Sequence, residues 1–126
     1  MYYCLLVVFG IVGASLRYAL GLLISIDQFP LATLMVNLLG CFLLAFISSL
    51  LTQLPYLANT VASAIGTGLV GSFTTFSTFA LESTTLIQDS NYLSAIVYIL
   101  ASLLGGLFAC VLGYKSSEGL LTWRKK

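Results

Sequence analysis

The stretch that decides the fold is residues 66–79, which read GTGLVGSFTTFSTF. Three glycines come first, and five of the seven residues from Ser72 to Thr78 then carry a hydroxyl group. Both residue types weaken a continuous helix, because glycine is conformationally free and Ser and Thr compete for backbone hydrogen bonds. The pattern therefore predicts that a helix is interrupted near residues 71–75.

The residues around this stretch are strongly apolar. Apolar residues make up 60% of the 126-residue chain, whereas charged residues make up 7%. A soluble domain with so few charges could not cover its surface, and so apolar a chain would not be disordered. The net charge of +1 and the lack of His in the sequence exclude an electrostatic nucleic-acid binder and His-based catalysis. The composition indicates an integral membrane protein.

The spacing of the charges predicts four membrane-spanning helices. No charged residue stands between Asp27 and Glu82, or between Asp89 and Lys115. A spanning helix needs about 20 apolar residues, and these segments lack the alternation of a β-barrel. We predict one all-α transmembrane domain over residues 1–126, with turns at 27–30, 54–55 and 89–91 and spans over 2–24, 32–53, 59–87 and 92–114. A continuous third span would be about 44 Å long, well beyond the roughly 30 Å hydrocarbon core.

A break in the third span would free backbone carbonyls and amides near the bilayer midplane. Such groups are tolerated only where they line a cavity or hold an ion. The alternative is that the small residues only permit close helix packing. We interpret Gly66 and Gly68 as packing residues and the hydroxyl-rich residues 71–75 as a functional break.

Polar and aromatic side chains on three spans indicate a pathway for a small anion. Phe76 and Phe79 share a helix face, and the positive edges of their rings can face an anion without trapping it. Hydroxyl and amide groups can donate hydrogen bonds to the same ion. For the amide of Asn37, a link between helices is an equally open interpretation. The candidate lining residues are Asn37, Phe76, Ser77, Thr78, Phe79, Tyr98 and Ser102.

Two ionisable residues lie within or at the margin of the spans. Arg17 stands near the end of the first span, where its side chain can reach the membrane surface, and we interpret it as a structural anchor. Glu82 follows Phe79 by one helical turn. It could guard an entrance or complete a hydrogen-bond network, and the sequence does not decide between these roles.

Three motifs resemble those of the Fluc (CrcB-type) fluoride channels. They are residues 10–18 (GIVGASLRY), residues 37–40 (NLLG) and, most specifically, residues 68–79 (GLVGSFTTFSTF). The resemblance implies a passive fluoride exporter of the cell membrane, built as an antiparallel dual-topology dimer with two pores. It implies that Phe76, Phe79 and Asn37 line the pore, and that a polar track is formed by Ser77, Thr78, Tyr98 and Ser102.

The resemblance also implies a structural sodium ion at the centre of the dimer. Four backbone carbonyls would hold it, those of Gly71 and Thr74 from each of two chains. The sequence departs from the family at Gly106 and Cys110, where relatives can carry hydroxyl groups. This departure leaves the far end of the polar track undecided.

Two other classes of small membrane protein have a similar size. A four-helix multidrug exporter needs a titratable carboxylate in its binding chamber, whereas the predicted first span contains no Asp or Glu. An assembly subunit without transport activity would need apolar helices but no hydroxyl-rich break. The sequence therefore favours the channel.

The distribution of Lys and Arg predicts a preferred orientation. Four spans place both termini on one side, and positive residues near span ends are retained in the cytoplasm. A chain whose Lys and Arg residues favour one orientation suits a dimer with a related chain that favours the opposite orientation. An antiparallel homodimer instead needs both orientations to insert equally. Both partners remain alternatives. The side with the termini carries Lys115, Arg124, Lys125 and Lys126, and the opposite turns carry Asp27 and Asp89.

Overall fold

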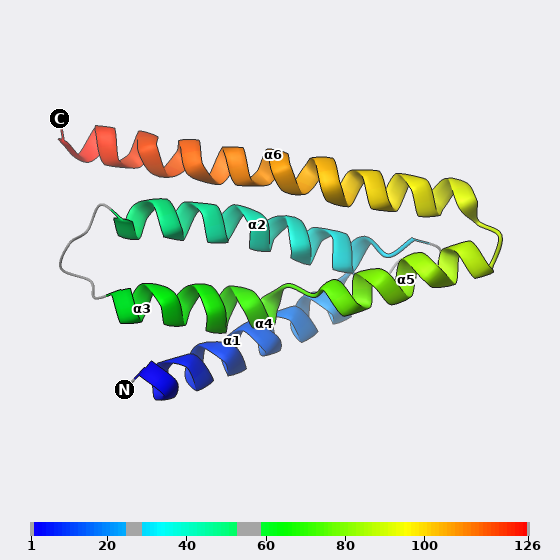
Figure 1. The fold of residues 1–126 in the computed structure, drawn as a ribbon, viewed down its shortest axis with the longest axis horizontal. Coiled ribbons are helices and arrows are strands. Elements are labelled where there is room, and N and C mark those ends of the chain that lie inside the picture. Colours follow the sequence, from blue (N-terminus) through cyan, green and yellow to red (C-terminus); the bar gives the residue numbers. More distant parts are fainter. Residues whose placement is uncertain (1, 25–28, 53–58, 126) are drawn as a thin grey trace.

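The computed structural model describes residues 2–24, 29–52 and 59–125, which are helical apart from short connections (Figure 1). The chain passes along the molecule four times, and its third passage is built from α3, η1, α4 and α5. The expectation of an all-α membrane fold with a broken third helix is confirmed. The elements are α1 (Tyr2–Leu23), α2 (Leu31–Thr52), α3 (Asn59–Ala64), the π-helix η1 (Ile65–Val70), α4 (Gly71–Phe73), α5 (Phe76–Gln88) and α6 (Tyr92–Lys125).

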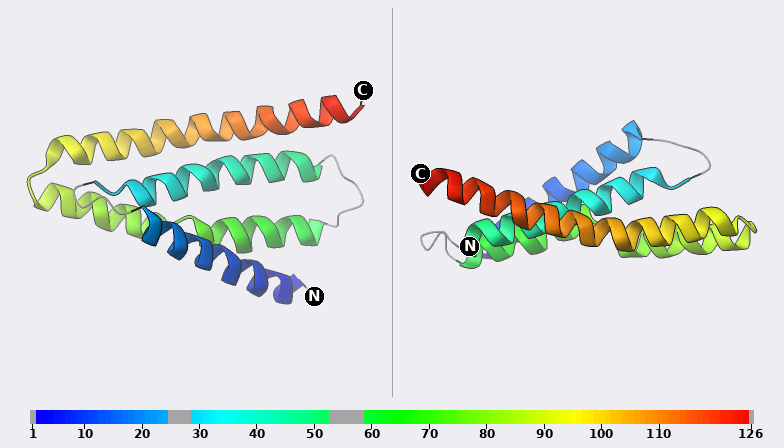
Figure 2. Two further views of the ribbon diagram at one scale, coloured as in Figure 1. Left: turned by 180° about the vertical axis from the view of Figure 1, so that it is seen from behind. Right: turned by 90° about the horizontal axis from the view of Figure 1, so that it is seen from above.

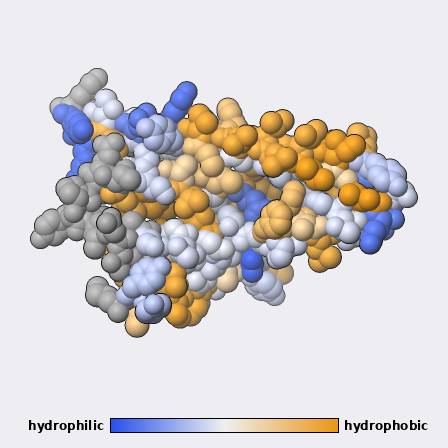
Figure 3. Space-filling model, in the orientation of Figure 1, coloured by the Kyte–Doolittle hydropathy of each residue, from blue (hydrophilic) through white to orange (hydrophobic). Residues whose placement is uncertain are grey.

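The outer surface of the helices suits a lipid environment. Helices α1, α2 (over Leu31–Leu51) and α6 are each long and apolar enough to cross a membrane. Large apolar side chains such as Leu23 and Leu107 are exposed on them, and apolar residues cover the flank formed by α6 (Figure 3). Water would strongly disfavour so much apolar surface.

Glycines allow α1 to approach the third passage closely. Helix α1 crosses α3, η1 and α4 obliquely (Figure 2). A Cβ atom on Gly13 would overlap the carbonyl group of Leu69, and one on Gly68 would press on the carbonyl oxygen of Leu6. Small residues that bring backbones together are a common means of helix association in membranes. The interpretation of Gly68 as a packing residue is confirmed.

Helices α2 and α6 form the second close pair. A Cβ atom on Gly113 would overlap the carbonyl group of Phe42, and one on Gly105 would press on the side chain of Leu38. Helix α6 has 34 residues, which corresponds to about 51 Å, and it continues well past residue 114. The side chains of Ser117 and Ser49 share a hydrogen bond beyond that point, so the polar residues there extend the helix pair.

The turn between α5 and α6 is tight. The amide of Asp89 bonds to the carbonyl of Thr85 at 2.9 Å, and Ser90 adopts a left-handed conformation with φ of 59°. The expected turns around Asp27 and Pro55 lie outside the described residues. Both ends of the described chain lie at the same end of the bundle, opposite the α5–α6 turn (Figure 1).

The close crossing of α1 and η1 gives a test by paired substitutions. We expect Gly13→Ala to destabilise the protein by about 1–3 kcal/mol, because the added methyl group overlaps backbone. Gly21→Ala on the same helix should be neutral or slightly stabilising, because no atom of the described residues outside its own helix backbone lies within 4 Å of the added Cβ and Ala is the better helix former. Thermal unfolding in detergent measures both. Equal effects of the two substitutions would contradict the packing described here.

Candidate functional site

The third passage is interrupted at residues 74 and 75. Helix α4 ends at Phe73, and the next two residues are extended, with ψ of 159° at Thr74 and φ of −149° at Thr75. Helix α5 then begins at Phe76. The predicted break near residues 71–75 is confirmed.

The side chain of Asn37 on α2 binds the break at two points. Its Nδ2 donates to the carbonyl of Thr75 at 3.0 Å, and its Oδ1 accepts from the amide of Thr75 at 2.9 Å. A carboxamide presents the same donor and acceptor as a peptide group. Asn37 therefore satisfies the backbone groups that the break frees, and it still has a second N–H to offer.

Two carbonyl groups beside the break lose their normal helical donors. In an α-helix each carbonyl accepts from the amide four residues later. For Gly71 that donor is Thr75, whose amide is bound to Asn37. For Thr74 it is Thr78, whose amide donates to Oγ1 of Thr75 at 3.2 Å. The side chains that stabilise the break thus release the carbonyls of Gly71 and Thr74.

Gly40 makes room for the break on α2. It lies one turn after Asn37 on the same helix, and a Cβ atom there would overlap Cγ2 of Thr74. The NLLG motif at residues 37–40 therefore has a structural explanation. Its first residue bonds to the break, and its last permits the approach.

Hydroxyl groups gather at the first turn of α5. Oγ1 of Thr75 accepts from the amide of Thr78 and donates to Oγ1 of Thr78 at 3.1 Å, and Oγ of Ser77 lies 3.4 Å from Oγ1 of Thr75. The Thr78 hydroxyl accepts one of these bonds, so its own hydrogen is available to another acceptor. The N-terminus of a helix also carries partial positive charge. This end of α5 therefore favours an anion.

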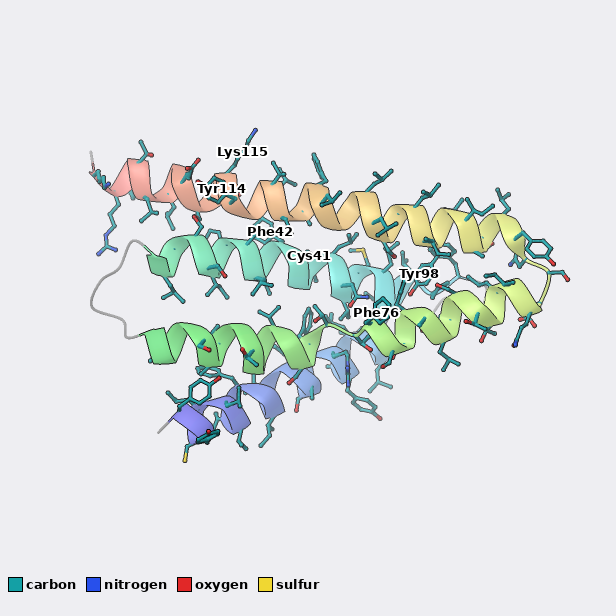
Figure 4. All side chains as sticks on the ribbon, in the orientation of Figure 1. Cys41, Phe42, Phe76, Tyr98, Tyr114 and Lys115 are labelled. Carbon is teal, nitrogen blue, oxygen red and sulfur yellow. The ribbon has the colours of Figure 1, made fainter. Side chains whose placement is uncertain are left out.

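An aromatic series follows the break. The ring centroids of Phe76 and Phe79 are 5.8 Å apart, and those of Phe79 and Tyr98 are 5.1 Å apart. Tyr98 is fully buried, whereas Phe76 is 79% exposed. Figure 4 shows Phe76 at the start of α5, directly after the break, and Tyr98 on α6. Helices α5 and α6 therefore contact each other through Phe79 and Tyr98, two residues that the sequence predicted as part of the pathway.

Glu82 is the centre of a hydrogen-bonded triad. Its Oε1 accepts from the Thr33 hydroxyl on α2 at 2.9 Å, and its Oε2 accepts from the Tyr98 hydroxyl on α6 at 2.9 Å. Of the two roles left open by the sequence, the structure places Glu82 in a network. Thr33 was not predicted as a site residue, because an isolated threonine in an apolar helix carries no sequence signal.

A cavity of about 430 Å³ opens beside the hydroxyl groups. Arg17 contributes to its wall from α1, Thr33 from α2, and Thr75 and Thr78 from the break and α5. The Arg17 side chain is exposed. Arg17 is the charged residue among the described residues of this wall, and the Thr78 hydroxyl keeps a hydrogen that is not used in the Thr75 pair. The cavity can therefore attract a small anion.

Along the face of α6 that carries Tyr98, a buried hydroxyl group is followed by small residues that pack against α2. Oγ of Ser102 is buried and has no hydrogen-bond partner among the residues that the structure describes. Further along, Cys110 Sγ contacts the carbonyl of Cys41 at 3.6 Å, and Gly106 packs near Cys41 Sγ. At Gly106 and Cys110, where relatives can carry hydroxyl groups, α6 therefore packs against α2.

Comparisons with known proteins identify the family. The model of the family described as "CrcB-like protein, Camphor Resistance (CrcB)" matches residues 4–114. The chain belongs to this family. It is 45% identical to Fluoride-specific ion channel FluC 1 of Bacillus cereus ATCC 14579 over 122 residues, which cover 94% of this chain and 85% of that protein. It is 43% identical to Fluoride-specific ion channel FluC 2 of Listeria monocytogenes serotype 4b over 121 residues, which cover 96% and 94%.

Membership of the CrcB family agrees with the architecture. The relatives are ion channels and not enzymes, and the apolar helices make this chain an integral membrane protein. The sequence-predicted residues Asn37, Ser77, Thr78, Phe79 and Tyr98 lie around the break and the aromatic series described above. Arg17 shares the cavity wall with Thr33 of the triad.

The contact between Asn37 and Thr75 gives the test of the site's construction. We expect Asn37→Ala to destabilise the protein by about 2–4 kcal/mol, because it leaves the partly buried amide and carbonyl of Thr75 without their side-chain partner. Gln88→Ala, which removes an exposed carboxamide from the last turn of α5, is the matched control and should have little effect. Thermal unfolding in detergent measures both. An Asn37→Ala protein as stable as the control would show that Asn37 does not hold the break.

Proposed function

We propose that this protein is a fluoride-specific passive channel that lets fluoride leave the cytoplasm and so relieves fluoride toxicity. The observation that carries the proposal is the aromatic pair of Phe76 and Phe79, which lies directly after a break lined by hydrogen-bond donors. The relatives from Bacillus cereus and Listeria monocytogenes, which are named fluoride-specific channels, support the choice of ion. On this proposal residues 1–126 form one transmembrane domain with spans over 2–24, 32–53, 59–87 and 92–114.

The proposed path uses weak donors in series. Asn37 has its second N–H, and Thr78 has a hydroxyl hydrogen that is not used within the Thr75 pair. Ser77 and Ser102 add further hydroxyls, and the ring edges of Phe76 and Phe79 face the ion between them. The Tyr98 hydroxyl donates to Glu82, so we assign its ring, rather than its hydroxyl, to the path. Weak contacts at several points permit an ion to enter and to leave.

We further propose a structural sodium ion at the break. The carbonyls of Gly71 and Thr74 have lost their helical donors to side-chain competitors, and neutral oxygen ligands without carboxylates suit a monovalent cation better than a divalent one. Gly71 is exposed, so a second chain could bring its own carbonyls to the same point. The ion would hold two broken helices together.

The partner in this proposal is an antiparallel second chain, either a copy of this one or a related one. Thr67 and Gly71 lie four residues apart on one helix face, and both are exposed. The 79% exposed Phe76 follows at the break. The Thr67 hydroxyl and the released carbonyl of Gly71 are costly against lipid. Covering them with the same surface of a second chain removes that cost and completes the path around Phe76.

Phenylalanine substitutions test the path. We expect Phe76→Ile and Phe79→Ile each to lower fluoride efflux from liposomes about tenfold or more, equivalent to about 1.4 kcal/mol in the barrier, because isoleucine keeps an apolar side chain but has no positive ring edge. Phe108→Ile is the control, since Phe108 is 65% exposed on the lipid-facing side of α6. Normal efflux through folded Phe76→Ile and Phe79→Ile proteins would refute the role of the rings.

Removal of sodium tests the proposed ion. We expect purification in N-methyl-D-glucamine chloride to lower both the melting temperature and fluoride efflux, because the released carbonyls of Gly71 and Thr74 would lose their shared ligand. Added Na⁺ should restore both properties at concentrations where K⁺ does not. Identical stability and efflux with and without Na⁺ would remove the sodium ion from the proposal.

Reporters at the C-terminus distinguish the two kinds of partner. The described end of α6 carries Arg124 and Lys125, at the end of the bundle opposite Asp89, so we expect a fused topology reporter to signal mainly from the cytoplasm. That result favours a related second chain of opposite bias. Equal signals from both sides of the membrane would instead favour a dual-topology homodimer.

A further inference from the structure

Ser83 is a buried serine on the face of α5 that points into the bundle. It follows Phe79 by four residues, so the two side chains share a face, and Leu86 continues that face one turn later. Leu86 belongs to the buried cluster that includes Tyr98, and Phe79 packs against this cluster. Ser83 itself is 7% exposed. Its hydroxyl group therefore lies in the interior, close to the aromatic series.

The Ser83 hydroxyl differs from the neighbouring hydroxyls of α5. The hydroxyls of Thr84 and Thr85 are exposed and donate to the carbonyls of Ala80 and Leu81, four residues earlier, at 2.8 and 2.9 Å. Oγ of Ser83 has no hydrogen-bond partner within the described parts of the chain. A buried polar group without a partner costs free energy. The hydrogen of the Ser83 hydroxyl is therefore available to an acceptor from outside the chain.

A second hydroxyl of this kind lies on the other side of the aromatic contact. Oγ of Ser102 is also buried and without a partner among the described residues, and Ser102 follows Tyr98 by four residues on α6. Helices α5 and α6 are antiparallel (Figure 1). Ser83 therefore lies between Phe79 and the end of α5 that meets the α5–α6 turn. Ser102 lies beyond Tyr98, further from that turn. The two hydroxyls bracket the contact between Phe79 and Tyr98.

We propose that Ser83 donates a hydrogen bond to fluoride on the α5–α6 turn side of the Phe79–Tyr98 contact. This inference rests on the proposed fluoride channel and extends its path beyond the residues discussed above. An ion that passes an aromatic contact has lost water, and a hydroxyl on each side replaces part of its hydration. A single neutral hydroxyl does this without trapping the ion. The path then continues along the inner face of α5 towards the end of the bundle opposite the termini.

The substitution Ser83→Ala tests the inference, with Thr84→Ala as the control on the same helix. Fluoride efflux from liposomes and thermal unfolding in detergent are measured for the wild-type protein and both variants. We expect Ser83→Ala to lower efflux roughly tenfold, the usual effect of losing one hydrogen bond to a charged group. Its melting temperature should stay the same or rise, because an unpartnered polar atom has been removed. Thr84→Ala should conduct as the wild type does.

The outcomes separate the inference from the proposed function. Wild-type efflux together with unchanged efflux through Ser83→Ala overturns the role of Ser83 and leaves the channel intact. A Ser83→Ala protein that loses stability and efflux together also overturns it, because Ser83 would then have a structural partner. If wild-type vesicles release no fluoride, the proposed function fails, and the inference fails with it.

Discussion

The pairing of the Asn37 carboxamide with the backbone of Thr75 is the interaction on which the rest of the site depends. Both hydrogen bonds are partly buried within the membrane-spanning part of the fold, where an unpaired peptide group would be costly. Because Asn37 takes the place of two helical partners, the third passage can stop at Phe73 and start again at Phe76. The break is thus held by side chains and is part of the folded state.

Several features follow from that one contact. With its amide and carbonyl bound to Asn37, Thr75 serves as the N-cap of α5 and accepts from the amide of Thr78. Helix α5 then presents Phe79 to Tyr98 and Glu82 to Thr33 and Tyr98. The triad at Glu82 ties α2, α5 and α6 together on the far side of the break. Glycines such as Gly40 and Gly13 provide the space that this arrangement needs.

Sequence reasoning predicted the break well, because glycines and clustered hydroxyls act locally on helix stability. It could not choose between a link and a pore donor for Asn37, since that choice depends on Thr75, 38 residues away. The structure shows the link, and one amide hydrogen remains for the proposed pore. Glu82 was undecided for the same reason, because its partner Thr33 lies on another helix. Composition could not predict the π-helix before the break or the continuation of α6 past residue 114.

The most direct test of the account compares two anions in one preparation. Liposomes that contain the purified protein are loaded with fluoride or with chloride, and release of each ion is followed with an ion-selective electrode. The account predicts rapid release of fluoride and release of chloride no faster than from protein-free liposomes, because hydroxyls and ring edges without a trapping charge favour a small anion. Equal release of both ions, or no release of fluoride, would contradict it.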